Sequence, residues 1–337
     1  MDDGFTEAET LGLFAKVLNT DVDTLPLEAK LIHKECKGMP LLIAMFSAHF
    51  EEFQNDMKIN TKRWTYYLNC IQTKDTKNKV INKFLKKQEA IFNMSIEHLP
   101  LELKTCYEQL AIFSEDVNIT PKTLEILWSR NMFEVEEMML ELCHKSLAGM
   151  RWNDNLSYYI YGVHDLLLCH LRKRLGKDKL TEMHKLFIEK CRKSCNNDFS
   201  KLPNDNYSYS YIGHHLELAE LYHEFPKLYL DFKFLEAKIN HTGLCDLLID
   251  FKKYRKYITN NNDASYEAKV VDIENFLQEQ ASNISKHRRK RCLDLIQIAM
   301  NHFYPGYVME TATNLAKERT KHLYLSHSTK LQQTNVT

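Results

Sequence analysis

The sequence has little of the two residues that most often interrupt regular structure, and it has no excess of charge of either sign. Its 337 residues include nine glycines and seven prolines, and 45 Lys and Arg side chains balance 45 Asp and Glu side chains. A dedicated nucleic-acid-binding protein usually carries a basic excess, so the neutral balance disfavours that class. Few glycines and prolines leave long helical patterns uninterrupted. We therefore expect a mainly α protein.

Long hydrophobic runs and paired cysteine spacings are also missing. The longest apolar run, from Met39 to Phe46, is too short to cross a bilayer. The nine cysteines are odd in number and lack repeat spacing, and no signal peptide opens the chain. Cys191 and Cys195 lie one helical turn apart near His184, but no second ligand pair has zinc spacing. We expect a cytoplasmic protein with reduced thiols, no bound metal and no membrane contact.

The phosphate-binding loop of nucleotide hydrolases is absent as well. No segment matches G-x-x-x-x-G-K-[ST], and the one Gly-Lys pair, Gly176-Lys177, has Leu171 where the first glycine of that loop must stand. We also find no nucleophile–base pairing and no cofactor fingerprint. The chain is therefore not expected to be an enzyme.

The first part of the chain has the pattern of a small helical bundle. Thr6 and Glu9 have the spacing of a capping box at the start of a helix. A second helix is expected to stop at Gly38, and a third to begin at Pro40, whose ring suits the first helical position. The third helix is apolar nearly all round, which predicts that it is buried. We assign residues 1–87 to this first helical domain.

The middle of the chain predicts helices followed by a β-hairpin. Thr120-Pro121 gives an N-cap and a first-turn proline. Two β-like stretches, 147–152 and 156–163, are joined by Asn153-Asp154-Asn155, a favourable turn sequence. Helices with such a wing describe a winged-helix domain, at 88–175. A second helical domain is expected at 176–310, and a C-terminal helix or linker with a disordered tail at 311–337.

Two short motifs carry a resemblance to a known family. The first, Cys36–Leu41, contains Gly38 and Pro40, and the second, Tyr161–Leu167, contains His164 and Asp165. With Leu110–Val117 between them, they resemble the NB-ARC module of signalling ATPases, in particular the apoptosome scaffolds of the apoptotic protease-activating factor and Dark type. Lys145–Leu147 and Phe251–Arg255 also fit that group.

The resemblance implies a nucleotide site. Pro40 would place its ring against the adenine, His164 would reach the β-phosphate of ADP, and Ser146 would lie near the nucleotide, with Gly38 and Asp165 in supporting roles. The local sequence around His164 and Asp165 also favours an anion site. The two residues follow an expected strand and open a helix, and the free N–H groups and the dipole at a helix start attract an anion. Asp165 is expected to cap that helix and to orient the imidazole.

The resemblance also implies that the phosphate-binding loop and the Mg²⁺ ligands lie upstream of residue 1, so that the chain is a fragment or a truncated product. ADP or ATP would then bind in the full-length protein, and weakly or not at all to this chain alone. The implied function is the regulatory part of an apoptosome-type switch in caspase activation and apoptosis. The implied partners are the missing nucleotide-binding domain, further copies of the protein and, indirectly, a caspase.

Two other functions stay open at this stage. A winged helix can bind DNA, but the helix before the wing carries Glu134, Glu136, Glu137 and Glu141 against His144 and Lys145, which opposes contact with phosphates. A helical scaffold or decoy without a nucleotide role would not need Pro40 and His164 to face one concave site, whereas the switch would. The basic run Lys286–Arg291 could serve nuclear import or RNA contact, or be a solvated face.

Overall fold

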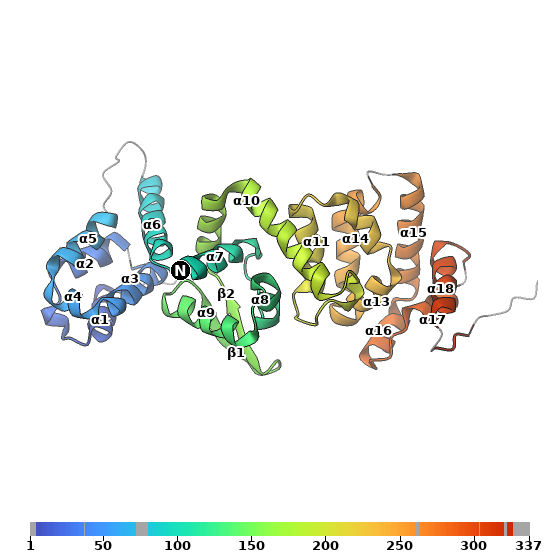
Figure 1. Cartoon of the computed structure of the whole chain (residues 1–337), viewed down its shortest axis with the longest axis horizontal. Helices are drawn as coiled ribbons and strands as arrows, with labels where there is room; N and C mark the ends of the chain where they lie inside the picture. Colours follow the sequence, from blue (N-terminus) through green and yellow to red (C-terminus); the bar gives the residue numbers. More distant parts are fainter. Residues whose placement is uncertain are drawn as a thin grey trace, which may run out of the picture. The chain divides into compact units, whose positions relative to one another are not determined.

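A computed structural model describes residues 5–36, 38–71, 80–260, 263–302, 304–319 and 322–325. The chain forms two compact units, Met1–Leu180 and Thr181–Thr337, which we describe separately. Helices dominate both units, and one antiparallel hairpin of two strands lies in the first (Figure 1). The prediction of a helical bundle, a winged helix and a second helical region is confirmed.

The bundle at the start of the first unit is held together by aromatic side chains. The Phe50 ring lies 4.5 Å from the Trp64 ring and 4.9 Å from the Phe14 ring, between centroids, and all three are buried. Trp64 also donates a hydrogen bond from Nε1 to the Met57 carbonyl, at 2.9 Å. The helices of this bundle are α1 (Glu7–Leu18), α2 (Leu27–Cys36), α3 (Pro40–Glu52), α4 (Gln54–Ile59) and α5 (Thr61–Ile71).

Gly38 makes the turn that leads into α3. Its φ of 70° lies in the left-handed region that favours glycine. The Gly38 carbonyl accepts a hydrogen bond from the Phe5 N–H at 2.7 Å, and a Cβ at Gly38 would stand 2.4 Å from the Phe5 carbonyl oxygen. The turn therefore ties the beginning of the chain to the start of α3, and the capping box of Thr6 and Glu9 starts α1 directly afterwards.

The winged-helix region combines four helices with the hairpin and the first turns of α10 (Asp165–Ser194). The two strands pair antiparallel from Gly149 opposite Gly162 to Asn153 opposite Tyr158, and Ile119 adds a bridge to Tyr161. The strands are shorter than the sequence predicts, because the turn takes residues 156 and 157 and because residues 147, 148 and 163 lie outside the pairing. The elements are α6 (Val80–Glu97), α7 (Leu101–Gln109), α8 (Pro121–Trp128), α9 (Met132–His144), β1 (Gly149–Asn153) and β2 (Tyr158–Gly162).

Arg172 on α10 fixes the segment between α7 and the Ile119 bridge. Its Nε donates to the Ala111 carbonyl at 3.1 Å, and its guanidinium also bonds the Phe113 carbonyl and the Glu115 carboxylate. Further along α10, Gly176 breaks the helical geometry with φ 75° and ψ 166°. The break coincides with the expected start of the second helical domain. The domain limits at 87 and 310 fall inside α6 and α18, and the domain limits stay predictions.

The second unit packs its helices around buried aromatic rings. Phe225, Tyr229, Phe232 and Phe234 are all buried. The expected disordered tail from 332 lies outside the described residues. The helices after α10 are α11 (Ser208–Leu218), α12 (Phe225–Tyr229), α13 (Phe232–His241), α14 (Leu244–Ile258), α15 (Ala264–Glu279), α16 (Ala281–Arg289), α17 (Leu295–Met300) and α18 (Tyr307–Glu318).

Two buried polar networks lie within this unit. Lys238, fully buried on α13, places Nζ 2.7 Å from the Tyr209 carbonyl, 2.7 Å from Asp246 and 2.9 Å from Asp250. In the other network, His215 contacts His184 between their Nδ1 atoms at 2.8 Å and the Tyr207 hydroxyl through Nε2 at 2.7 Å. Burial holds the pKa of His215 well below its usual value.

Candidate functional site

A cavity of about 580 Å³ opens in the winged-helix region where three connections meet. These are the connection from α9 to the hairpin, the step from β2 into α10, and the segment at 116–118 before α8. Three of the residues proposed from the sequence, Ser146, His164 and Asp165, line it together. The other lining residues are Asp116, Val117, Asn118, Cys143, Leu147, Ala148, Gly149, Gly162, Val163 and Leu167.

His164 stands directly before α10 and is exposed. Its Nδ1 accepts a hydrogen bond from the Leu166 N–H at 3.2 Å, and its carbonyl accepts from the N–H groups of Leu167 and Leu168. The imidazole therefore caps the helix as an Asn or Ser side chain would. Because Nδ1 is the acceptor, the neutral ring carries its proton on Nε2. This atom can donate a hydrogen bond to an anion without the ring becoming charged.

Asp165 does not have the role expected of it, because it does not cap α10. The cap of α10 comes from the His164 imidazole, and no hydrogen bond joins the Asp165 carboxylate to that ring within the part of the chain that the structure describes. Asp165 is half-buried and is the first residue of the helix, where a negative side chain interacts favourably with the helix dipole. It lines the cavity beside His164 but does not orient the imidazole.

Ser146 reaches the cavity from the end of α9. Its φ of 58° is left-handed, and this conformation turns the chain out of the helix. The Ser146 N–H donates to the Cys143 carbonyl and the Leu147 N–H to the Leu142 carbonyl, both at 2.9 Å, which is the hydrogen-bond pattern of a helix end. Serine is tolerated at such a position, and its hydroxyl adds a hydrogen-bonding group to the cavity wall.

The charges around the cavity are negative. Asp116 and Asp165 contribute carboxylates, and none of the described lining residues is Lys or Arg. Cys143 is neutral, because burial raises the pKa of its thiol to about 11. The groups that favour an anion are the positive end of the α10 dipole and the His164 ring. The cavity alone is therefore poorly suited to hold a multiply charged phosphate.

Gly38 and Pro40 do not line this cavity. Pro40 is exposed at the first position of α3, and Gly38 forms the preceding turn. The structure thus brings Ser146, His164 and Asp165 together, whereas an approach of Pro40 to a nucleotide stays a prediction.

Sequence reasoning missed several residues of the cavity wall. Asp116, Val117 and Asn118 come from the segment that Arg172 holds, and nothing local in the sequence indicates that it would lie beside the α9 end. Gly149 and Gly162 could have been noticed, since they face each other at the base of the hairpin. A Cβ added at Gly162 would meet no atom within 4 Å, so the glycine leaves open space at the cavity.

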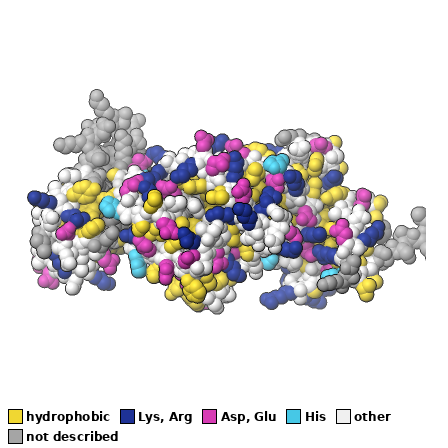
Figure 2. Space-filling model, in the orientation of Figure 1, with side chains coloured by type: hydrophobic (Ala, Val, Ile, Leu, Met, Phe, Trp, Pro, Cys, Tyr) yellow, Lys and Arg dark blue, Asp and Glu magenta, His cyan; other side chains and the backbone are white. Residues whose placement is uncertain are grey.

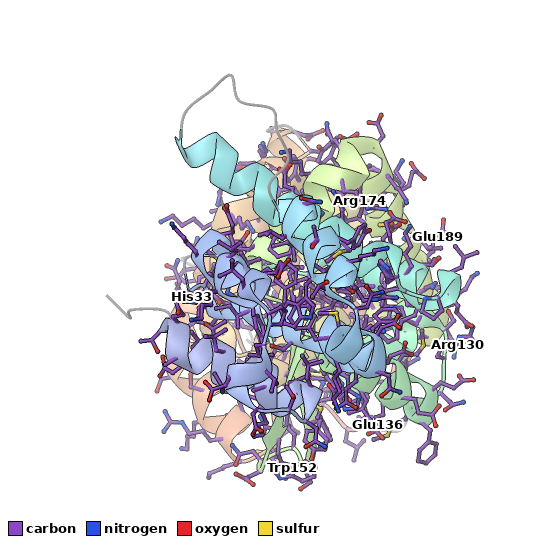
Figure 3. The ribbon with its side chains drawn as sticks, turned by 90° about the vertical axis from the view of Figure 1, so that its left-hand side faces the viewer. His33, Arg130, Glu136, Trp152, Arg174 and Glu189 are labelled. Atoms are coloured by element: carbon purple, nitrogen blue, oxygen red, sulfur yellow. The ribbon has the colours of Figure 1, made fainter. Side chains whose placement is uncertain are left out.

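The outer surface of the wing is apolar. Trp152 and Tyr159, opposite each other in the register, make an edge-to-face contact at 5.2 Å between ring centroids. Both are exposed, as is Met150. Hydrophobic side chains gather over the wing at the lower edge of Figure 2, and Figure 3 shows Trp152 at the outer end of the hairpin. This surface lies apart from the cavity lining.

The fold and the cavity define a winged-helix domain that is followed by a helical domain. The profile of the winged-helix domain of apoptotic protease-activating factor 1-like proteins matches residues 102–171, and the profile of the APAF-1 helical domain matches residues 180–319. The chain belongs to the family of apoptotic protease-activating factor 1-like proteins.

Nearly all of this chain is similar to a part of each of several apoptotic protease-activating factor 1 proteins. Apoptotic protease-activating factor 1 of Danio rerio is 27% identical over 328 residues, which cover 95% of this chain and 24% of the relative. The human protein is 27% identical over 335 residues, covering 97% of this chain and 25% of the relative, and the mouse protein is 26% identical over 331 residues, covering 96% and 25%. The chain thus spans about a quarter of the length of these relatives. Among the described residues, no helix is long and apolar enough to cross a membrane.

Proposed function

We propose that this chain is the regulatory part of an apoptosome-type nucleotide switch. In this proposal His164 and Ser146 contact the phosphate side of bound ADP, and Pro40 covers the adenine. The phosphate-binding loop and the Mg²⁺ ligands come from a nucleotide-binding domain that is not within these residues. Hydrolysis is therefore not an activity of this chain.

The observation that carries the proposal is the cap of α10 by His164. The Leu166 N–H occupies Nδ1, which leaves the Nε2–H of the neutral ring for a ligand. The same helix end offers the partial positive charge of its dipole, roughly half an elementary charge. A hydrogen-bond donor and a helix N-terminus at one cavity suit a phosphate oxygen, and Ser146 in the same lining supplies a hydroxyl.

The negative lining of the cavity supports a divided site. Asp116 and Asp165 are nearby, and none of the described lining residues is Lys or Arg. This chain would therefore orient the phosphate groups of ADP more than neutralise their charge. We therefore expect ADP to bind weakly or not at all here without the nucleotide-binding domain.

In the complete protein, ADP would join the winged helix to the nucleotide-binding domain through His164. Exchange for ATP, with an upstream signal, would release the winged helix and allow copies of the protein to assemble. That assembly would then activate a caspase, as the name of the relatives, apoptotic protease-activating factor, indicates for them. The contribution of this chain would be to hold the inactive state and to form part of the assembled scaffold.

The test separates the ligand contact of His164 from its structural role. The segment that precedes the match in the Danio rerio relative is joined to this chain, and the ADP retained through gel filtration is measured after denaturation. His164→Ala removes both the cap and the Nε2 donor. His164→Asn keeps a side-chain acceptor for the Leu166 N–H, since Asn is a favoured N-cap, but lacks the ring.

We expect both variants to retain several-fold less ADP than the parent chimera and to shift toward assembled species. The Ala variant alone should lose thermal stability, by about 1 kcal/mol. Retention of ADP by His164→Asn at the parent level, with an unchanged monomer peak, would contradict the proposal.

A further inference from the structure

One face of the hairpin is covered at its base and bare along its outer half. Residues opposite each other in an antiparallel pair lie on the same face, so Met150 and Tyr161 share a face with Trp152 and Tyr159. Tyr161 is only 3% exposed, whereas Trp152 and Tyr159 are 52% and 43% exposed. We call the exposed residues Met150, Trp152 and Tyr159 the wing face. Hydrophobic side chains gather over it in Figure 2.

Helix α9 supplies the cover at the base of the hairpin. Cys143, in the last turns of α9, lines one cavity with Gly149 and Gly162, the pair that closes the hairpin. Burial and then the nearby Glu136 carboxylate raise the pKa of Tyr161 to about 12, so the same side of α9 faces this ring. A helix is therefore the element that already packs on this face, and it leaves the wing face uncovered.

The side of α9 next to the wing face continues the apolar surface. Phe133 and Leu140 stand three residues before and four residues after Glu136, so the three lie on one side of the helix. Phe133 and Leu140 are exposed. Glu136 is half-buried and Glu137 exposed, and neither has an ion pair in the part of the chain that the structure describes. Large apolar side chains thus lie beside two carboxylates without counter-charges.

Two arginines of this region do not neutralise those carboxylates. Arg130 pairs with Glu102 and Glu134 instead. Arg151 is opposite Ile160 in the register, so it lies on the other face of the hairpin, where its guanidinium donates to the Asn118 side chain at 2.9 Å. The negative charge favours a basic partner and disfavours the anionic headgroups of a membrane surface.

We infer that the wing face and the adjoining side of α9 bind a basic amphipathic helix of a partner protein. Its apolar side would cover Trp152 and Tyr159 as α9 covers Tyr161, and exposed Trp and Tyr side chains are frequent anchors of such contacts. Its Lys or Arg side chains would pair with Glu136 and Glu137 and lay their aliphatic stems on the neighbouring apolar groups. The wing face is not part of the cavity lining, so the inference does not rest on the proposed function.

The experiment uses the whole chain and a labelled helical peptide of Leu and Lys, with Leu along one side. Fluorescence anisotropy measures binding, and acrylamide quenching of tryptophan measures coverage of the wing face. Quenching reports on Trp152, because Trp64 and Trp128 are buried. The Leu/Lys peptide should bind and shield Trp152 from acrylamide. The same peptide with Glu in place of every Lys keeps the apolar side and should bind about tenfold more weakly or less, since its charge repels the carboxylates.

Two double variants test the two parts of the surface. Trp152→Ser with Tyr159→Ser should weaken binding of the Leu/Lys peptide by about tenfold or more, because it removes both aromatic anchors. Glu136→Lys with Glu137→Lys should weaken it by about tenfold and should make the Leu/Glu peptide the better ligand. The midpoint of thermal unfolding should change little, which separates lost binding from lost folding.

Matched controls remove the same kinds of side chain elsewhere on the first unit. Leu27→Ser with Leu101→Ser deletes two exposed leucines, and Asp21→Lys with Asp23→Lys reverses two exposed carboxylates. Both pairs should leave peptide binding within about twofold of the parent, because surface changes away from a contact have small effects. Controls that weaken binding as much as the wing variants would overturn the inference.

Three further outcomes would also overturn it. The first is a bound Leu/Lys peptide that leaves quenching of Trp152 unchanged. The second is shielding of Trp152 by rising protein concentration without peptide, which would assign the wing face to a second copy. The third is shielding by phosphatidylcholine vesicles but not by the peptide, which would assign it to a membrane.

Discussion

Gly38 shows at the residue scale how one backbone conformation fixes the start of a buried helix. The residue lies in the left-handed region, and its carbonyl receives the Phe5 N–H. The same glycine belongs to the motif that leads to Pro40. Its position in the sequence therefore has a structural reason that holds whether or not a nucleotide lies nearby.

Gly38→Ala should destabilise the first unit by about 2 kcal/mol or more. The left-handed conformation costs a side chain about 1–2 kcal/mol, and the added Cβ would meet the Phe5 carbonyl oxygen at 2.4 Å. Gly12→Ala is the opposite control, because Gly12 lies within α1 with no atom within 4 Å of its added Cβ. That substitution should stabilise by roughly 0.5–1 kcal/mol. Urea unfolding of both variants measures the difference, and equal effects would refute the role of Gly38.

At the scale of elements, Lys238 joins three helices of the second unit. It lies on α13 and contacts the Tyr209 carbonyl of α11 as well as Asp246 and Asp250 of α14. Burial raises the pKa of Asp250 despite the neighbouring ammonium, and the Tyr229 hydroxyl donates a further hydrogen bond to that carboxylate at 2.6 Å. The helices are thus held by a charge that has no access to water.

Lys238→Met should cost about 3–5 kcal/mol, because it leaves a buried carboxylate without its partner. Lys238→Met with Asp250→Asn should recover part of the loss, since the two residues form one network. Lys193→Met, an exposed change on α10, should stay within about 0.5 kcal/mol. Thermal unfolding followed by circular dichroism is sufficient, and a Lys238→Met variant as stable as Lys193→Met would show that the network contributes little.

The elements that the sequence predicted best are those whose ends are set by local chemistry. The Thr6–Glu9 capping box, the cap at Thr120 and the helix start at Pro40 all occur as expected. The hairpin limits were wrong by a few residues. Leu147 and Val163 are apolar and buried like strand residues, but Leu147 closes the end of α9 and Val163 precedes the cap of α10.

The candidate site was predicted only in part, because some of its contacts depend on distant parts of the chain. His164 and Ser146 were found through the family motifs, and the cavity brings them together. The cap by the His164 ring was not predicted, because Asp165 was expected in that role, and the contribution of Asn118 was not, because it depends on where Arg172 holds a distant segment. Likewise, the basic run was visible in the sequence, whereas the hydrogen bond from Arg288 to the Asn240 carbonyl required the position of α13.

At the scale of the whole molecule, a neutral protein with buried histidines should lose stability in mild acid. The pKa of His215 is strongly lowered by burial, and burial also lowers those of His170 and His241. Above the pKa of the unfolded chain, about 6.5, these rings are neutral in both states and have no effect. Below that pKa, the histidines of the unfolded chain bind protons while the buried rings of the folded chain stay neutral, so acid favours unfolding.

Between about pH 6.5 and pH 5.5 the folded protein should lose about 1 kcal/mol through His215 alone, since one pKa unit corresponds to about 1.4 kcal/mol. His215→Gln should flatten this dependence while costing stability at neutral pH through the altered contact with Tyr207. Urea titrations at several pH values measure both effects. An unchanged slope in the variant would assign the acid sensitivity to other groups.

If the cavity at His164 is one part of a divided nucleotide site, as we propose, a kinetic consequence follows. A surface that offers one donor and little positive charge has almost no affinity of its own. Tethered in one polypeptide to the domain that grips the phosphates, it meets the ligand at an effective concentration of about millimolar or more. A contact of this kind acts chiefly on the escape of ADP, because it must open before the nucleotide leaves. Under the proposed function, His164 would set the residence time of the nucleotide rather than its equilibrium affinity for this chain.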